Sequence, residues 1–248
     1  MYMIRCFWRG LRKKVVNISN YDFVVENYNE ICYNIQNARI KYTKEQGEVQ
    51  ILAVTKTVAP EIINASIDCG ITLLGENRVQ EYLSKKEFYK PCDVHFIGHL
   101  QTNKVKYIIN DVSMIQSVDS LKLASEINRQ ALKNNKIMDI LIEVNIGEEL
   151  SKSGVSKNEV FDLVDEISDL PAVRIKGLMA IPPINSDDRI YASLYEAFNS
   201  LKERNIPNVD MSILSVGMSG DYEKAIKYGS NLVRIGTKLF GARKYVEV

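Results

Sequence analysis

The sequence has few of the residues from which metal sites and disulfide networks are built. Its 248 residues include four cysteines, which are far apart and form no Cys-x-x-Cys pair: Cys6, Cys32, Cys69 and Cys92. This spacing argues against both a zinc site and a disulfide framework. Unpaired cysteines fit a protein of a reducing compartment, and we expect a cytoplasmic location.

Histidine is scarcer still, because the chain has only His95 and His99. Two histidines four positions apart would share one face of a helix. Gly98 and the strand-like run between them remove that face, so we expect no metal site here. His99 stays a candidate for lining the end of a strand.

An excess of charge and a long apolar run are also missing. The chain has 32 Lys and Arg against 31 Asp and Glu, a formal net charge of +1. A nucleic-acid-binding surface normally needs a basic excess, so we expect no nucleic-acid partner. No apolar run approaches the roughly 20 residues that cross a bilayer, so we expect no membrane partner either. Small molecules are the expected ligands.

Residues 1–21 depart from this balance. They contain five basic residues and no acidic one: Arg5, Arg9, Arg12, Lys13 and Lys14. Three interpretations stay open, namely a basic and disordered surface extension, a start codon assigned too early, or a transit peptide, which would place the protein in mitochondria.

The apolar pattern of residues 22–248 predicts one α/β domain. Runs rich in β-forming residues occur at 51–55, 72–75, 93–97, 113–118, 139–145, 173–179, 212–216 and 231–235. Helical patterns fill most of the gaps, and a further helix is predicted from Tyr21 to about Glu45. Eight alternating strands favour a closed (β/α)₈ TIM-type barrel over an open doubly wound sheet. The first strand also lacks the Gly-x-Gly-x-x-Gly turn of a dinucleotide-binding sheet.

The first predicted strand delivers a lysine, Lys56, at its carboxyl end, and Pro60 begins the helix that follows. Barrels and open α/β sheets build their active sites at these strand ends. Lys56 is therefore either a solvated surface lysine or an amine able to form a Schiff base with a carbonyl group.

The loops after strands seven and eight contain the material of a phosphate site. Ser219 lies between two glycines after strand seven, and Gly236 and Thr237 follow strand eight. In barrels these two loops commonly hold phosphate groups through backbone amides and hydroxyls. Either loop alone is an ordinary turn, whereas both together favour a phosphate-bearing ligand.

Two further residues are candidates for the same ligand. Arg234 ends strand eight, where its guanidinium either makes a structural ion pair or donates to the ligand. Asn77 follows strand two and either caps a helix or reaches the aromatic edge of a cofactor. Together with Lys56, these residues favour a phosphorylated carbonyl compound, with pyridoxal 5′-phosphate the leading case.

Several motifs between residues 50 and 243 resemble those of one protein family. They are AVTKT at 53–57, GENRVQE at 75–81, HFIGHLQTNK at 95–104, SKSG at 151–154, GLMAIP at 177–182, SVGMSGD at 215–221, VRIGT at 233–237 and FGAR at 240–243. The chain thereby resembles the pyridoxal phosphate homeostasis proteins, single-domain relatives of the N-terminal barrel of alanine racemase. Residues 1–21 have no counterpart in this resemblance.

The resemblance implies a role for most of the candidate residues. Lys56 would carry pyridoxal 5′-phosphate as an internal aldimine, and Ser219, Gly236 and Thr237 would hold its phosphate. Arg234 would face the pyridine nitrogen and keep it unprotonated, which weakens the cofactor as an electron sink.

The resemblance also suggests a function without a dedicated catalytic cycle. Alanine racemases add a C-terminal β domain that supplies a tyrosine base, and this chain ends a few residues after Arg243. We therefore expect a monomeric carrier of the cofactor, without assigned catalytic residues, whose partners include pyridoxal-phosphate-dependent apo-enzymes. Lys152 is either a second acceptor of the cofactor or a solvated loop lysine. A racemase, and less readily a Schiff-base aldolase, are the alternatives.

Overall fold

The computed structural model describes residues 21–42, 47–147 and 153–242. The basic stretch at 1–20 and the loop lysine Lys152 lie outside the described residues, so the expectations made for them stay predictions. Among the described helices, none is both long and apolar enough to cross a membrane.

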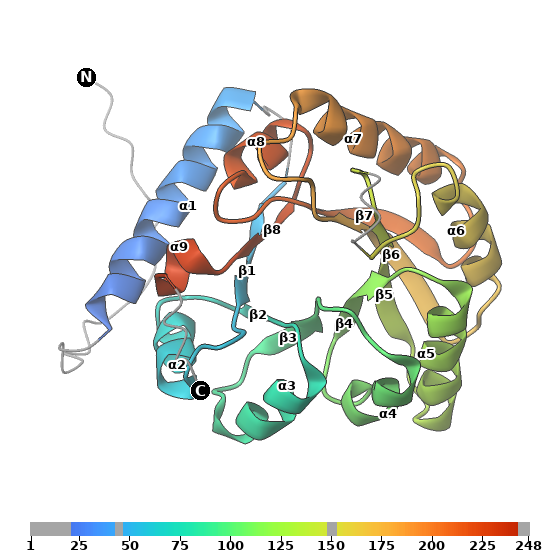
Figure 1. The fold of residues 1–248 in the computed structure, drawn as a ribbon, viewed down its shortest axis with the longest axis horizontal. Coiled ribbons are helices and arrows are strands. Elements are labelled where there is room, and N and C mark those ends of the chain that lie inside the picture. Colours follow the sequence, from blue (N-terminus) through green and yellow to red (C-terminus); the bar gives the residue numbers. More distant parts are fainter. Residues whose placement is uncertain (1–20, 43–46, 148–152, 243–248) are drawn as a thin grey trace.

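The strands of the described residues close into the predicted barrel. In order they are β1 (Gln50–Val54), β2 (Leu73–Glu76), β3 (Asp93–Phe96), β4 (Met114–Val118), β5 (Met138–Val144), β6 (Val173–Ala180), β7 (Val209–Ser215) and β8 (Leu232–Ile235). Each pairs in parallel with the next, and β8 pairs with β1 to close the ring (Figure 1). The (β/α)₈ prediction is confirmed.

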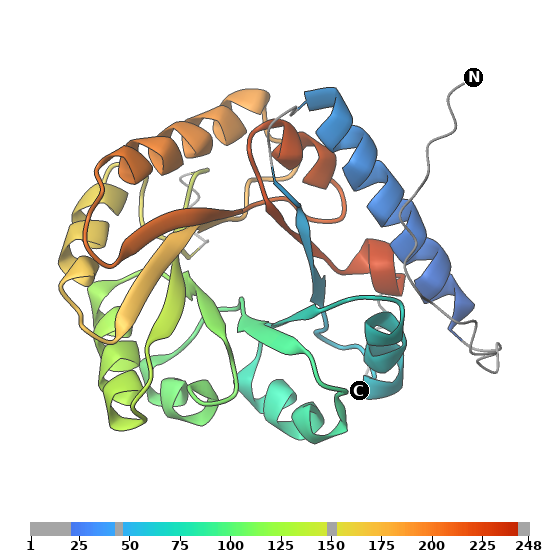
Figure 2. The ribbon, with the colours of Figure 1, turned by 180° about the vertical axis from the view of Figure 1, so that it is seen from behind.

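Helices surround this ring, and the view from behind shows the same arrangement (Figure 2). Their bounds are α1 (Asp22–Tyr42), α2 (Pro60–Asp68), α3 (Val79–Lys85), α4 (Val105–Ile108), α5 (Leu121–Lys133), α6 (Val160–Ser168), α7 (Asp188–Glu203), α8 (Tyr222–Lys227) and α9 (Thr237–Phe240), with 3₁₀ turns at Lys86–Phe88 and Thr102–Lys104. The predicted N-terminal helix is present as α1.

Local sequence signals fix several helix ends. Pro60 occupies the first turn of α2, and Gly70, with a φ of +117°, follows its last residues. The backbone N–H of Glu159 donates to the Ser156 hydroxyl 3.3 Å away, in the turn just before α6. Pro60 and the turn at Ser156 thus mark where two helices begin, and Gly70 marks where α2 ends before β2.

The strands bury alternate residues on opposite sides. In β8, Val233 and Ile235 face the helices and join the main core, while Leu232 packs inside the barrel. The two-residue period of a strand therefore places Arg234 inside as well. In β5 the same alternation sends Glu143 into the barrel with Leu141, a member of the inner cluster. The mouth of the barrel is thus polar although its floor is apolar.

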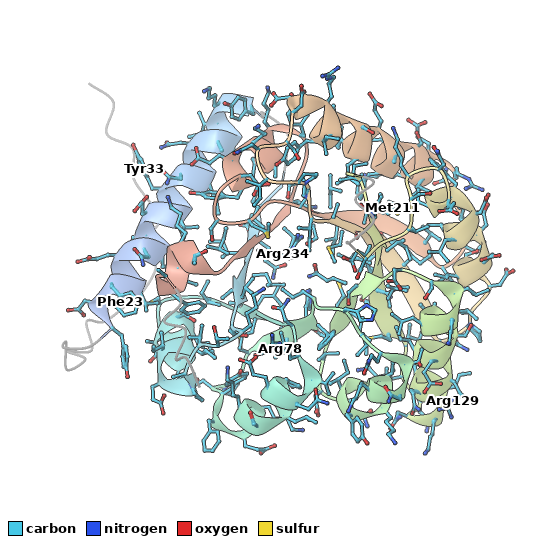
Figure 3. The ribbon with its side chains drawn as sticks, in the orientation of Figure 1. Phe23, Tyr33, Arg78, Arg129, Met211 and Arg234 are labelled. Atoms are coloured by element: carbon cyan, nitrogen blue, oxygen red, sulfur yellow. The ribbon has the colours of Figure 1, made fainter. Side chains whose placement is uncertain are left out.

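Helix α1 lies along α8 and α9, outside the β1–β8 seam (Figure 1). Asn27 Nδ2 donates to the Leu239 carbonyl at 3.0 Å, and Lys238 Nζ lies 2.9 Å from Glu30 Oε1. Phe23 and Tyr33 point away from the barrel on the outer side of α1 (Figure 3). The helix that precedes β1 therefore braces the two helices that follow β7 and β8.

Candidate ligand site at the barrel mouth

A cavity of about 680 Å³ opens at the carboxyl ends of the strands around the β1–β8 seam. Its lining includes five of the six predicted site residues, namely Lys56, Ser219, Arg234, Gly236 and Thr237. They meet because β1 and β8 are paired, with Leu52 opposite Arg234 and Ala53 opposite Ile235. Residues separated by about 180 positions thus share one site.

The loops after β7 and β8 join at this cavity through Ser219. Its Oγ accepts a hydrogen bond from the Lys238 backbone N–H at 3.1 Å and lies 3.4 Å from Thr237 Oγ1. Lys224 and Lys238 also belong to the lining, although their ammonium groups pair with Asp188 and Glu30. Hydroxyls and backbone amides at one wall suit an anionic group such as a phosphate.

Asp221 holds the loop after β7 in shape. Its two carboxylate oxygens accept hydrogen bonds from the Met218 backbone N–H and the Tyr191 hydroxyl, each at 2.6 Å. Gly217 has a φ of +99°, and a Cβ there would lie 2.9 Å from the Tyr222 Cα. The loop therefore requires glycine at this position and a carboxylate at Asp221.

The loop that carries Lys56 is anchored on both sides. Buried Thr55 donates from its hydroxyl to Glu76 Oε1 at 2.6 Å, and burial raises the pKa of Glu76. The Thr57 backbone N–H donates to Glu81 Oε1 at 2.5 Å. The half-buried Lys56 between them is thus held at the cavity wall on a fixed backbone.

Arg234 lies inside the barrel, near the centre of the ring (Figure 3). Its guanidinium donates to the Ser215 carbonyl at 2.7 Å, the Ser215 hydroxyl at 2.8 Å and the Ala180 carbonyl at 2.8 Å. Burial lowers its pKa to about 10, against the opposing charges of Glu143 and Asp221. Arg234 thus remains a cation at neutral pH, held by three hydrogen bonds.

A chain of buried side chains continues from Arg234 across the barrel. The Ser215 hydroxyl donates to Gln116 Oε1 at 2.7 Å, and Gln116 Nε2 lies 2.8 Å from His95 Nδ1. Because the amide nitrogen only donates, Nδ1 accepts and the proton of the neutral ring sits on Nε2. Burial lowers the pKa of His95 to about 4, so the ring stays neutral at physiological pH.

The sixth predicted residue, Asn77, lines a different cavity. This second cavity has a volume of about 220 Å³ and is also lined by His99 and Glu143. Asn77 Oδ1 is buried and has no hydrogen-bond partner among the described residues. A contact between Asn77 and a ligand of the main cavity therefore stays a prediction.

The structure adds residues that the sequence patterns did not single out. Gln116, Glu143, Ser215 and Asp221 are polar, and the first three are buried at the barrel mouth. The only signal for Gln116, Glu143 and Ser215 was a polar residue in an apolar strand, and this signal says nothing about which neighbours the residue meets. No group of three or more His, Cys, Asp or Glu side chains is placed to hold a metal within the described ranges.

Comparison with known proteins assigns the chain to a family. The family described as alanine racemase, N-terminal domain, matches residues 27–244. A protein of Aquifex aeolicus named pyridoxal phosphate homeostasis protein is 42% identical over 224 residues, which cover 89% of this chain and 98% of that protein. The chain belongs to the pyridoxal phosphate homeostasis protein family.

Solved structures agree with this family and with the fold. PipY of Synechococcus elongatus, in a structure with pyridoxal phosphate (PLP) bound, is 26% identical with a TM-score of 0.76, covering 88% of this chain and 100% of that one. An alanine racemase of Clostridium difficile is 18% identical with a TM-score of 0.72, covering 92% of this chain and 58% of that one. The racemase likeness shows the shared barrel, while the homeostasis family is shown by the sequence relatives.

Proposed function

We propose that this chain binds pyridoxal 5′-phosphate in the main cavity, as a Schiff base on Lys56, and carries it for pyridoxal-phosphate-dependent apo-enzymes. The observation that carries the proposal is that Lys56 lines the same cavity as Ser219, Gly236 and Thr237 of the loops after β7 and β8. When bound, the cofactor supplies an aldehyde that an amine can hold reversibly. Family membership supports the same ligand.

The residues of the cavity fit this ligand. A volume of about 680 Å³ lies in the range of small-molecule sites. Ser219, Gly236 and Thr237 would hold the phosphate through hydroxyls and backbone N–H groups. Lys56, on its anchored loop, would hold the aldehyde carbon.

The contacts of Arg234 favour a carrier of the cofactor rather than an enzyme. A guanidinium that is protonated at neutral pH and fixed by three hydrogen bonds cannot accept a hydrogen bond or a proton from a pyridinium nitrogen. The ring nitrogen beside it would stay unprotonated, which disfavours carbanion chemistry.

The tyrosines of the cavity support the same conclusion. Burial, a hydrogen bond to Asp221 and that carboxylate's charge raise the pKa of Tyr191. Burial likewise raises the pKa of Tyr222, whose hydroxyl accepts from Asn34 Nδ2 at 3.1 Å. Both remain neutral phenols at physiological pH, so neither is poised as the proton-abstracting base of a racemase.

The test compares the visible spectra of the full chain and of Lys56→Ala after incubation with pyridoxal 5′-phosphate. We expect a Schiff-base absorbance band in the full chain, its loss in Lys56→Ala, and covalent labelling of Lys56 after borohydride reduction. Lys90→Ala is the matched control, because Lys90 is an exposed lysine paired with Asp68. A band that survives in Lys56→Ala would place the linkage elsewhere.

A second assay separates a carrier from a racemase. The loaded chain is incubated with L-alanine in deuterated water, and the α-deuterium content and stereochemistry are followed. We expect no sustained exchange or inversion, but transfer of the cofactor to an apo-enzyme that regains activity. Multiple turnovers of inversion would overturn the carrier proposal.

A further inference from the structure

The second cavity lies at the ends of β2, β3 and β5, beside the strands that carry the main cavity. Its polar lining residues are Asn77, His99, Glu143, Asn145 and Ser153. With a volume of about 220 Å³, it has room for a small group only. The proposed cofactor site assigns no ligand contact to Asn77 or Glu143, although the charge of Arg234 acts on Glu143.

Glu143 is the most unusual of these residues. It is only 7% exposed, and no described group donates a hydrogen bond to its carboxylate. Burial, and to a lesser extent the charge of Asp119, raises its pKa to about 7, while the Arg234 cation opposes the shift. A buried carboxylate without a donor is costly, so a donor supplied by a ligand would be bound favourably.

Asn77 provides a second, independent acceptor in the same cavity. Its Oδ1 is buried without a hydrogen-bond partner. The Ser153 side chain adds a hydroxyl to the lining, and among the described residues of this cavity there is no lysine or arginine. The main cavity differs, because Lys56 and Arg234 are both part of its lining.

We infer that the second cavity binds the ammonium group of a small primary amine, with Glu143 as its counter-ion and Asn77 as a further acceptor. An ammonium group carries three N–H donors, enough for Glu143 and Asn77 together. A free amino acid is disfavoured, because its carboxylate would be repelled by the Glu143 carboxylate in so small a cavity. The expected ligand class is therefore a plain amine.

The use of this amine rests on the proposed function of the main cavity. Residues Thr55 and Gly75, next to Lys56 and near Asn77, are joined by a backbone hydrogen bond of 3.1 Å, so the two cavities lie on neighbouring strand ends. An amine held here can take the carbonyl carbon from Lys56. A C=N bond to the amine would form as the C=N bond to Lys56 breaks. The amine nitrogen loses two protons and the Lys56 nitrogen gains two. No atom changes its oxidation state.

The direct test needs no cofactor. The full-length Lys56→Ala chain, labelled with ¹⁵N-histidine, is titrated with propylammonium chloride at pH 8, where Glu143 is ionised. His99 lines the cavity and is one of only two histidines, so its imidazole resonances report occupancy. We expect a saturable shift at His99, a dissociation constant at least tenfold larger after adding Glu143→Gln, and no change with Glu166→Gln, an exposed glutamate of α6.

A ligand series on the same chain keeps the inference testable even where Glu143→Gln fails to fold. Propan-1-ol has the same shape without charge, and 3-aminopropionate has the same length with an added carboxylate. We expect both to bind at least tenfold more weakly than propylammonium. Equal binding of all three, or an unchanged affinity in a folded Glu143→Gln chain, would overturn the amine site.

The cofactor-loaded chain tests the use of the amine separately. We expect the fraction of Lys56 labelled after borohydride reduction to fall with a rate that saturates in propylamine, and about tenfold more slowly at low amine in Glu143→Gln. A rate that rises linearly without saturation, equal in both chains, would mean attack directly from solvent. A failure to label Lys56 at all would contradict the proposed function alone, because the histidine titration does not depend on it.

Discussion

The buried His95 gives a prediction on stability that can be worked out in numbers. Burial holds the pKa of its imidazole at about 4, whereas a histidine of the unfolded chain titrates near its ordinary value of ~6.5. Between these values the unfolded chain binds the extra proton and the folded chain does not. The contribution of His95 to the free energy of unfolding is therefore fully present above about pH 6.5 and falls as the pH is lowered towards 4. Below about pH 4 it no longer changes.

The size of the effect follows from the two pKa values. At pH 5 the proton uptake of the unfolded state lowers the free energy of unfolding by about 2 kcal/mol relative to pH 7. The full difference, reached below pH 4, is roughly 3 kcal/mol, since each pKa unit corresponds to about 1.4 kcal/mol. Protonation of His95 Nδ1 would also remove the acceptor for Gln116 Nε2. This would weaken the series of hydrogen bonds that runs from His95 through Gln116 and Ser215 to Arg234.

The assay is urea unfolding at pH 7 and pH 5 of the wild-type chain, His95→Asn and His99→Gln. Asparagine keeps an acceptor for Gln116 but does not titrate, so we expect His95→Asn to lose about 2 kcal/mol less between the two pH values. The exposed His99 serves as the control and its variant should follow the wild type. An identical pH dependence in His95→Asn and wild type would refute the argument.

Three further predictions concern the backbone, the phosphate loops and the guanidinium. Gly177→Ala should lower the free energy of unfolding by about 3 kcal/mol in urea titrations, because its φ is +148° and a Cβ would lie 1.8 Å from the Ile213 carbonyl oxygen. Ser219→Ala should raise the dissociation constant of pyridoxal phosphate about tenfold in absorbance titrations, since it removes a hydroxyl from the proposed phosphate site; unchanged affinity would remove Ser219 from that site. Arg234→Lys should destabilise the chain by about 2 kcal/mol and shift the absorbance band of the bound cofactor, because a single ammonium cannot reproduce the forked contacts to Ser215 and Ala180.

The fold was accessible from the sequence because every strand is a short apolar run and the runs alternate with helical patterns. The largest error in the strand starts is in β7, which begins at Val209 rather than at 212. Its first residues are partly exposed and Asp210 pairs with Lys176 at the outer edge, so the apolar run starts late. The predicted start of β7 at 212 marked where its residues become apolar, whereas the strand itself starts earlier, where its backbone begins to pair.

The candidate site was accessible where it depends on strand ends. Lys56 and Gly236 were expected to share one ligand because each follows the carboxyl end of a strand, and the structure places them in one cavity. The series of hydrogen bonds from His95 through Gln116 to Ser215 could not be expected from the sequence. It depends on how far distant strands are shifted relative to one another along the barrel axis. Register shifts in β4–β5, β5–β6 and β6–β7 set those relative positions, and no residue pattern announces them.

The pairing of β1 with β8 also has a consequence for the order of assembly during synthesis. Lys56 leaves the ribosome long before other residues that line its cavity, such as Ser219 and Thr237. The site comes into existence only when the last strand docks on the first and α1 closes over α8 and α9. A ligand bound there would stabilise the paired state of β1 and β8. At a free concentration a hundred times its dissociation constant, it would raise the free energy of unfolding by about 2.7 kcal/mol. Occupancy of the cavity would thus report that the barrel has been completed.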